Sequence, residues 1–395
     1  MKKRINIAVI GHLDHGKSTL IGRLLFDSEA LSKEEIKEII KIKKNNEELE
    51  YSLFLDTLRE ERQNQLTLDT TQVILKARKL EYNFIDCPGH REFIKNMLTG
   101  TSQAEYAILV VSAKLNEGIE KQTTMHIILA KLLGIRKLFV VINKMDAVNY
   151  KKERFFELKD KLKDYLRKIN FYKKTIFIPI SAKKGENTIR ESYSMKWYKG
   201  GTLLKLLNES ANFLNSKNTG SLRILIQDIY FEQNKNILIG RIAKGTLRVN
   251  DWIFLNLSKQ KGKVRQIVSN QRIKRVSKEG ECIGIAIENI DLDKVKRGEV
   301  ISSIYSRPQV RKNFQADIFF LNNMNKRNLR FLLKCGLKET YCRIELMGFK
   351  DYIYKTKVFL NEALTIESVL KTPHLGRFIL VDKNGNIAGL GNVDV

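Results

Sequence analysis

Cysteine is scarce in this sequence of 395 residues, which contains only four. Cys87, Cys282, Cys335 and Cys342 form no CxxC pair and show no spacing typical of metal ligands. The pattern therefore argues against a zinc cluster, and we expect four reduced thiols packed in the core.

Long hydrophobic runs are also lacking. No apolar run approaches the roughly 18 residues that a membrane helix needs. The basic start "MKKR" is followed by "INIAVI" and then by Gly11, so the apolar part is too short for the core of a signal peptide. With 43% hydrophobic and 29% charged residues, we expect a globular protein located in the cytoplasm.

Acidic residues are outnumbered, because 71 Lys and Arg face 44 Asp and Glu and give a net charge of +27. Such a charge fits a polyanionic partner such as RNA, or a general composition bias spread over solvated faces. Since the lysines are scattered along the whole chain, we favour the second interpretation. The densest cluster, "KQKGKVRQIVSNQRIKRVSK" (Lys259 to Lys278), is kept as a candidate contact surface.

The length predicts two or three domains. Residues 5–210 alternate helical stretches with β-branched runs that are apolar throughout, as expected of parallel strands buried on both faces. Those runs are "INIAVI", "YNFID", "YAILVVSA", "KLFVVINK" and "TIFIPISA". One apolar stripe at spacings of 3 and 4 predicts a helix that buries Phe155, Leu158, Leu162, Tyr165 and Ile169. We therefore predict a doubly wound α/β domain with a mostly parallel sheet.

Two further features set the domain organisation. Ser32 and Glu35 form a capping box, and a charged helical insertion is expected over about residues 31–62. After about residue 217 the helical period gives way to short strands typical of β-barrels, with Pro308 near a join. The predicted domains are an α/β domain at 1–217 and two β-barrels at 218–307 and 308–395, the last of them short.

A phosphate-binding loop follows the first strand. Gly11, Gly16, Lys17 and Ser18 fit the pattern G-x4-G-K-S between a strand and a helix, which is the context that this loop requires. Its glycines let backbone N–H groups point inward at an anion. Lys17 would reach the β- and γ-phosphates, and the Ser18 hydroxyl would bind Mg²⁺, which prefers oxygen ligands.

Two segments would sense the terminal phosphate. "DCPGH" places Asp86 where it can hold a water bound to Mg²⁺, Gly89 near the γ-phosphate, and His90 where an attacking water would lie. Thr67, between the phosphate loop and Asp86, is the expected switch residue that contacts the γ-phosphate and Mg²⁺. The predicted catalytic residues are Lys17, Thr67 and His90, and the predicted metal ligands are Ser18, Thr67 and Asp86.

Two later loops select the base. In "NKMD", the Asp146 carboxylate can accept hydrogen bonds from guanine N1–H and N2–H₂, a donor pair that adenine lacks. Asn143 and Lys144 brace the base and the phosphate loop, and "SAK" (Ser181 to Lys183) adds a loop over the base. We therefore predict GTP and Mg²⁺ as cofactors. The predicted nucleotide-binding residues are Gly11, His12, Asp14, His15, Gly16, Lys17, Ser18, Thr19, Asp86, Pro88, Gly89, His90, Asn143, Lys144, Asp146, Ser181, Ala182 and Lys183.

These motifs resemble the translation-factor GTPase superfamily, most densely over residues 5–210. "ELEYSLFLDTLREERQNQLTLDTTQ" and "GRFILVD" are similar to the GTPase subunit of bacterial sulfate adenylyltransferase, whereas "DCPGHREF" and "TGTSQAE" resemble elongation factor 1-alpha. The first resemblance implies a GTPase that drives adenylyl sulfate formation from ATP and sulfate on a partner catalytic subunit, and this is the prediction that we adopt. The second implies a translation GTPase that binds aminoacyl-tRNA.

One departure from the superfamily pattern concerns the switch. Relatives usually carry Gly-Ile-Thr where this chain has Gln65, Leu66 and Thr67. A residue other than glycine costs roughly 1–2 kcal/mol wherever a positive φ is required, so the closed switch is expected to be less stable or to have a different shape. The resemblance also implies that Leu13 and Leu66 flank His90.

Overall fold

The computed structural model describes residues 3–30, 36, 51–53, 72–76, 80–87, 104–169, 171, 175–215, 221–232, 235–269, 272–321 and 329–394. The predicted insertion at about 31–62 lies outside them except for residues 36 and 51–53. The chain divides into two compact units, Met1–Lys131 with Ile135–Phe213, and Leu132–Gly134 with Leu214–Val395. None of the helices in the described part is both long and apolar enough to cross a membrane.

The first unit is built on a six-stranded sheet in the order β2-β3-β1-β4-β5-β6. All neighbouring strands are parallel except β2, which runs antiparallel to β3 at one edge. Every residue of β4 is buried, which explains why its run is apolar without alternation. The strands are β1 (Lys3–Gly11), β2 (Gln72–Lys76), β3 (Leu80–Asp86), β4 (Tyr106–Ser112), β5 (Lys137–Asn143) and β6 (Thr175–Pro179).

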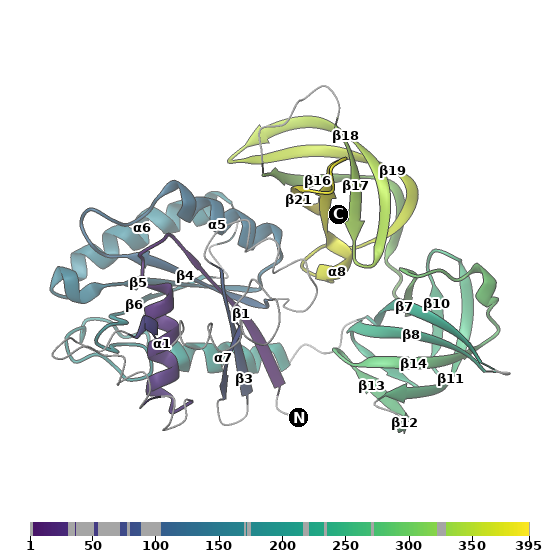
Figure 1. The fold of residues 1–395 in the computed structure, drawn as a ribbon, viewed down its shortest axis with the longest axis horizontal. Coiled ribbons are helices and arrows are strands. Elements are labelled where there is room, and N and C mark those ends of the chain that lie inside the picture. The colour runs from purple at the N-terminus through teal and green to yellow at the C-terminus, as the bar shows by residue number, and fades with distance from the viewer. Residues whose placement is uncertain are drawn as a thin grey trace. The chain divides into compact units, whose positions relative to one another are not determined.

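Helices cover both faces of this sheet, with α5 and α6 on one face and α1 and α7 on the other (Figure 1). In α6 the buried side chains are Phe155, Leu158, Leu162 and Leu166, while Tyr165 is only half-buried. The prediction that Tyr165 is buried is therefore wrong, and Leu166 occupies the buried position instead. With 3.6 residues per turn, the position four residues after Leu162 faces the sheet better than the position three residues after it. The helices are α1 (Lys17–Asp27), η1 (Met145–Val148), α5 (Lys121–Leu132), α6 (Lys152–Lys168) and α7 (Leu203–Asn215).

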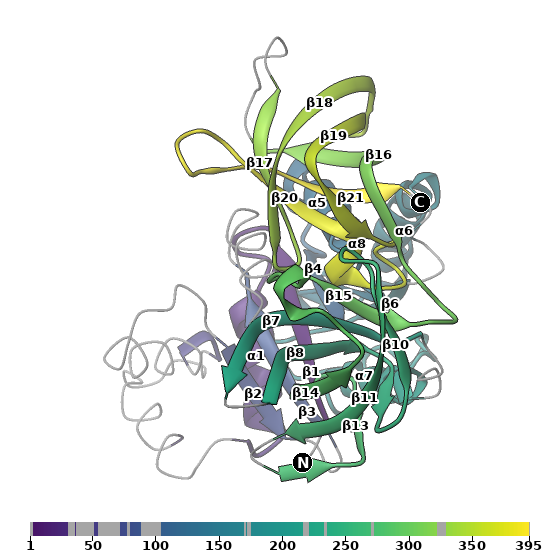
Figure 2. The ribbon, with the colours of Figure 1, turned by 90° about the vertical axis from the view of Figure 1, so that its right-hand side faces the viewer.

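The second unit begins with a seven-stranded antiparallel sheet in the order β10-β15-β7-β8-β14-β11-β12. β10 also pairs with β11, which closes six of these strands into a ring (Figure 2). The buried side chains of this ring form an aliphatic core. The elements are β7 (Arg223–Glu232), β8 (Lys235–Lys244), β9 (Thr246–Arg248), β10 (Trp252–Leu255), β11 (Gln260–Ser269), β12 (Arg272–Lys274), β13 (Val276–Lys278), β14 (Cys282–Glu288), η3 (Leu292–Lys294) and β15 (Val300–Ser303).

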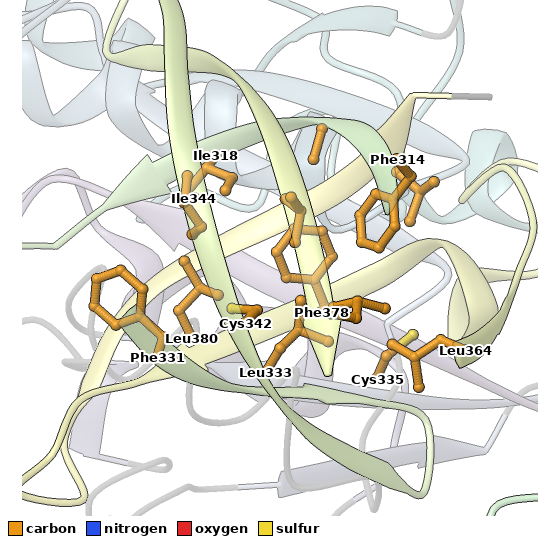
Figure 3. Packing of buried hydrophobic residues seen from close by; sticks show 14 of the residues in the cluster. Phe314, Ile318, Phe331, Leu333, Cys335, Cys342, Ile344, Leu364, Phe378 and Leu380 are labelled. Atoms are coloured by element: carbon orange, nitrogen blue, oxygen red, sulfur yellow. The ribbon is translucent and has the colours of Figure 1, made fainter. Parts of the chain in front are cut away.

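A closed six-stranded barrel in the order β16-β19-β18-β17-β20-β21 completes the second unit. Burial alternates along β17 and the first half of β18, so one face of each strand fills the barrel. Figure 3 shows this for Phe331 and Leu333 of β17, which lie in one cluster with Phe378 of β20. The α/β sheet followed by β-barrels confirms the predicted fold class. The elements are β16 (Gln309–Phe320), β17 (Arg330–Cys335), β18 (Lys338–Lys350), β19 (Ile353–Ile366), α8 (Pro373–Gly376), β20 (Arg377–Val381) and β21 (Ile387–Asp394).

The cysteines depart from one expectation. Cys87, Cys335 and Cys342 are buried free thiols, but Cys282 is exposed. Cys282 begins β14 on the outward side of its barrel, where the burial pattern alternates along the strand. The expectation of four core thiols is therefore wrong for Cys282.

Candidate functional site

The candidate site lies along one edge of the parallel sheet. Because β1, β3, β4, β5 and β6 are parallel, their carboxyl ends meet at the same edge (Figure 1). The described loops that follow β1, β4, β5 and β6 begin at this edge. The loops after β1, β5 and β6 carry the predicted phosphate and base motifs. The structure thus brings together segments that are more than a hundred residues apart in the sequence.

The phosphate loop has a backbone that only glycine adopts at two positions. Gly11 has φ 147°, and an added Cβ would lie 2.4 Å from the carbonyl oxygen of Val110. Gly16 has φ 88°, and its Cβ would lie 2.5 Å from Asn143 Nδ2. The two glycines let the loop turn tightly between β1 and α1, which is the shape of a phosphate cradle.

Lys17 closes the cradle from the inside. Its buried ammonium donates to the carbonyl oxygens of Gly11, at 3.0 Å, and His12, at 2.9 Å. Ser18 and Thr19 follow in the first turn of α1 and are half-buried. The residues therefore fit a phosphate-bearing ligand, because a lysine ammonium lies within a tight glycine loop at the N-terminus of α1.

Asn143 connects three of the loops. Its buried amide donates from Nδ2 to the carbonyl oxygen of His15 at 2.9 Å, and its Oδ1 accepts from the N–H of Ala182 at 3.0 Å. One side chain at the end of β5 thus fixes the phosphate loop and the "SAK" loop at once.

Replacing Asn143 with Ala is expected to destabilise the first unit by about 2–4 kcal/mol, because two buried backbone groups lose their partner. The sequence has two tryptophans, and Trp197 lies in the first unit. In a Trp252→Phe background, Trp197 fluorescence during urea unfolding reports this unit alone. The control is Asn116→Ala, the same change at an exposed asparagine in the loop after β4, with an expected change below about 0.5 kcal/mol. Equal midpoints for both variants would refute the linking role of Asn143.

The base loops meet at Asp146, in η1. Ser181 is buried and donates from Oγ to Asp146 Oδ1 at 2.6 Å, and the same Oγ accepts from the N–H of Lys184 at 3.2 Å. A carboxylate has about four acceptor positions, so Asp146 can still accept from a ligand. Lys183 contributes its carbonyl oxygen, which accepts from Arg23 of α1 at 3.2 Å.

The two histidines of the phosphate loop pack against the β4–α5 connection. His15 is buried, its Nδ1 lies 3.2 Å from the Val110 carbonyl oxygen, and burial lowers its pKa below the usual value. His12 Nδ1 contacts Gln122 Oε1 at 2.6 Å and Glu120 Oε2 at 3.0 Å. These contacts support the shape of the loop rather than an acid–base role.

The remaining predicted residues are placed only in part. Asp86 ends β3 and is buried, and the N–H of Cys87 donates to Val9 at 3.1 Å. Thr67, Pro88, Gly89 and His90, together with Gln65 and Leu66, lie outside the described residues. Leu13 and Asp14 are exposed, and Asp14 has φ 62°. The predicted roles of the switch residues therefore stay predictions.

One acidic residue of the site was missed from the sequence. Glu117, in the loop after β4, accepts from Lys144 Nζ at 2.9 Å. Although burial raises the pKa of Glu117, hydrogen bonds from Ser112 and Lys144 outweigh it and lower that pKa to about 2. The sequence did contain a signal for Glu117. The run "YAILVVSA" predicts a parallel strand, and the loop after such a strand must lie at the same edge of the sheet as the phosphate and base loops.

Comparison with known proteins identifies relatives of the whole chain. Residues 2–216 match the family "Elongation factor Tu GTP binding domain", and residues 236–302 match "Elongation factor Tu domain 2". Elongation factor 1-alpha of Picrophilus torridus is 35% identical, covering 100% of this chain and 98% of its own length. Elongation factor 1-alpha of Thermoplasma acidophilum is 34% identical with the same coverage, as is that of Methanocaldococcus jannaschii.

These relatives overturn the functional prediction made from short motifs. A GTPase subunit of sulfate adenylyltransferase, with a partner catalytic subunit and a place in sulfate assimilation, is wrong, because the similar curated proteins are elongation factors 1-alpha along their whole length. The stretches that favoured it are short. "RFILV" is strand β20, where burial in the barrel restricts residue choice.

Proposed function

This chain belongs to the GTPase family of the elongation factor Tu GTP-binding domain, and we propose that it acts in translation as a GTP-dependent carrier of aminoacyl-tRNA. The observation that carries the proposal is similarity to elongation factor 1-alpha across 100% of the chain, barrels included. The net charge of +27 is compatible with a polyanionic partner, but its spread along the whole chain means that it does not carry the proposal.

The nucleotide site supports GTP as the bound nucleotide. In this proposal the cradle of Gly11, Gly16 and Lys17 takes the phosphates, and Asp146 accepts from the guanine edge. The side chain of Asn143 keeps the two loops in register, and Ser181 orients the Asp146 carboxylate. Adenine is rejected because it would leave the Asp146 acceptor unpaired.

Hydrolysis would depend on positioning and charge rather than covalent chemistry. Ser18, Thr67 and Asp86 offer the oxygen ligands that suit Mg²⁺, which supplies neutralisation of phosphate charge when bound. Lys17 takes up charge between the β- and γ-phosphates, Thr67 and Gly89 hold the terminal phosphate, and His90 orients the water. We also propose that the chain consists of three domains, at residues 1–217, 218–307 and 308–395. We propose that the protein works in the cytoplasm.

The test is protection of the ester bond of aminoacyl-tRNA from spontaneous hydrolysis. With GTP or a non-hydrolysable analogue bound, we expect the protein to protect aminoacyl-tRNA at least tenfold better than with GDP, because the switch is held only by the terminal phosphate. Deacylated tRNA, followed by a gel shift, is the control for binding through charge alone. Equal protection with GTP and GDP, or equal affinity for deacylated tRNA, would contradict the proposal.

A further inference from the structure

Arg154, in the first turn of α6, holds the loop that follows β4. Its side chain is only 12% exposed. Nε donates to the carbonyl oxygen of Ala113 at 2.9 Å, and Nη2 donates to those of Lys114, at 2.9 Å, and Glu117, at 3.1 Å. One guanidinium therefore satisfies three backbone carbonyls of a single loop, a set of bonds that only the arginine fork can supply.

The loop lies directly against the helix. Gly118 has φ 137°, and a Cβ added there would be 3.3 Å from Leu158 Cδ2 and 3.4 Å from Arg154 Nη2. At its start, the N–H of Ala113 donates to the carbonyl oxygen of Asn143 at 2.8 Å. The path of residues 113–118 is thus set by α6 on one side and by the end of β5 on the other.

This loop delivers the Glu117 carboxylate to Lys144. Glu117 Oε2 lies 2.9 Å from Lys144 Nζ, and Lys114 Nζ lies 3.5 Å from Oε1. A pKa of about 2 keeps Glu117 ionised at every pH at which the protein would work. Lys144 has φ 62° and stands between Asn143 and Asp146, so the ion pair fixes the middle of the base-binding motif.

We propose that Arg154 is a positioning residue for the guanine base, acting through Glu117 and Lys144. Arg154 sets the loop, the loop sets Glu117, and Glu117 holds the Lys144 side chain beside the base. This inference rests on the proposed binding of GTP and extends it, because the motif around Asp146 gives no indication of a support on α6.

Arg154→Ala is expected to raise the dissociation constants of GDP and GTP about tenfold each, measured with fluorescent guanine nucleotides. The ratio of the two constants should not change, because the relay reaches the base and not the terminal phosphate. Arg154→Lys, which keeps the charge and part of the bonding, should recover part of the affinity. Arg167→Ala is the matched control on the same helix, since the side chain of Arg167 is 55% exposed and its nitrogen lies 3.8 Å from the Asp164 carboxylate.

A second measurement needs no nucleotide. Labelling of lysine amines followed by mass spectrometry should show Lys144 several-fold more reactive in Arg154→Ala and in Glu117→Gln than in the wild type, with exposed Lys168 as internal reference. Glu117→Gln retains the loop backbone, so it remains informative even if Arg154→Ala does not fold. Unchanged Lys144 labelling in both variants, or a loss of GTP affinity without a loss of GDP affinity, would overturn the relay. A wild-type protein that binds neither nucleotide would instead overturn the proposed function, while the labelling result would still decide the relay.

Discussion

Asp146→Asn is expected to lower the affinity for GDP and GTP by about 10²- to 10⁴-fold and to create affinity for xanthine nucleotides. The carboxylate is proposed to accept two hydrogen bonds from guanine, and bonds to a charged group contribute about 1.5–3 kcal/mol each. Xanthine has a carbonyl oxygen where guanine has its amino group, so it can accept from the new asparagine amide. Competition between unlabelled nucleotides and a fluorescent guanine or xanthine nucleotide measures both effects.

The control for Asp146→Asn is Asp160→Asn, the same change at an exposed position of α6. It should leave both affinities unchanged within about twofold, because a surface carboxylate so placed touches no ligand. Xanthine affinity that stays undetectable in Asp146→Asn, with guanine affinity intact, would remove Asp146 from the base site. Loss of affinity for guanine nucleotides without any gain of affinity for xanthine nucleotides would indicate that the substitution disrupts the contact with Ser181, whose Oγ lies 2.6 Å from Asp146 Oδ1.

The fold was predictable because its signals are local and repeated. Each of the five predicted α/β runs corresponds to a strand between β1 and β6, since a strand buried on both faces must be apolar throughout. The short strand β2 did not appear among them. The position of the nucleotide-binding loops was predictable for the same reason. Parallel strands place their carboxyl ends at one edge of the sheet, so motifs that follow those ends must lie close together.

Contacts that depend on tertiary packing were not predictable. Glu117 and Arg154 are 37 residues apart, and no short motif contains both. Arg223 and Glu367 are 144 residues apart, and their pairing depends on how two barrels within one unit fold. The prediction of a sulfate adenylyltransferase subunit was wrong for a related reason. It depended on a few residues near Thr71 and in β20, whereas the similarity that identifies the family extends over the whole chain.

Breaking the buried ion pair of Arg223 and Glu367 should strongly destabilise the second unit. Arg223 is 1% exposed and binds Glu367 through two bonds, Nε to Oε2 at 3.1 Å and Nη2 to Oε1 at 2.7 Å. Its Nη1 also donates to the carbonyl oxygens of Leu222 and Ser306, each at 2.8 Å, and Thr372 donates to Glu367 at 2.7 Å. The strand β7 and the segment after β19 are thus joined by one buried ion pair whose arginine donates four hydrogen bonds.

Arg223→Met is expected to destabilise the second unit by about 3–5 kcal/mol, because it leaves a carboxylate buried without its counter-ion. Urea unfolding in a Trp197→Phe background, where Trp252 reports this unit, measures the loss. Replacing both partners in Arg223→Met/Glu367→Met should recover about half of it, since the uncompensated charge is then gone. The control is an ion pair on the surface, between Arg343 and Glu345, in which the side chain of Arg343 is 54% exposed. Arg343→Met breaks this pair and should destabilise the unit by less than about 1 kcal/mol.

The dependence of this loss on pH follows from the pKa of Glu367. Although burial raises that pKa, hydrogen bonds from Arg223 and Thr372 outweigh it and hold it below the usual value of 4.5. A depressed pKa adds stability that is fully present above about pH 4.5 and is lost as the pH falls through the folded-state value. In Arg223→Met, burial, the Thr372 bond and the charge of Lys244 remain, but both contributions of Arg223 are gone. The pKa of Glu367 should therefore rise, and the buried carboxyl should be protonated more easily. The stability difference between wild type and Arg223→Met should therefore be largest above about pH 6 and shrink below pH 4.5. A difference that is constant across this range would show that Arg223 stabilises the unit through packing and its backbone bonds rather than through the charge of Glu367.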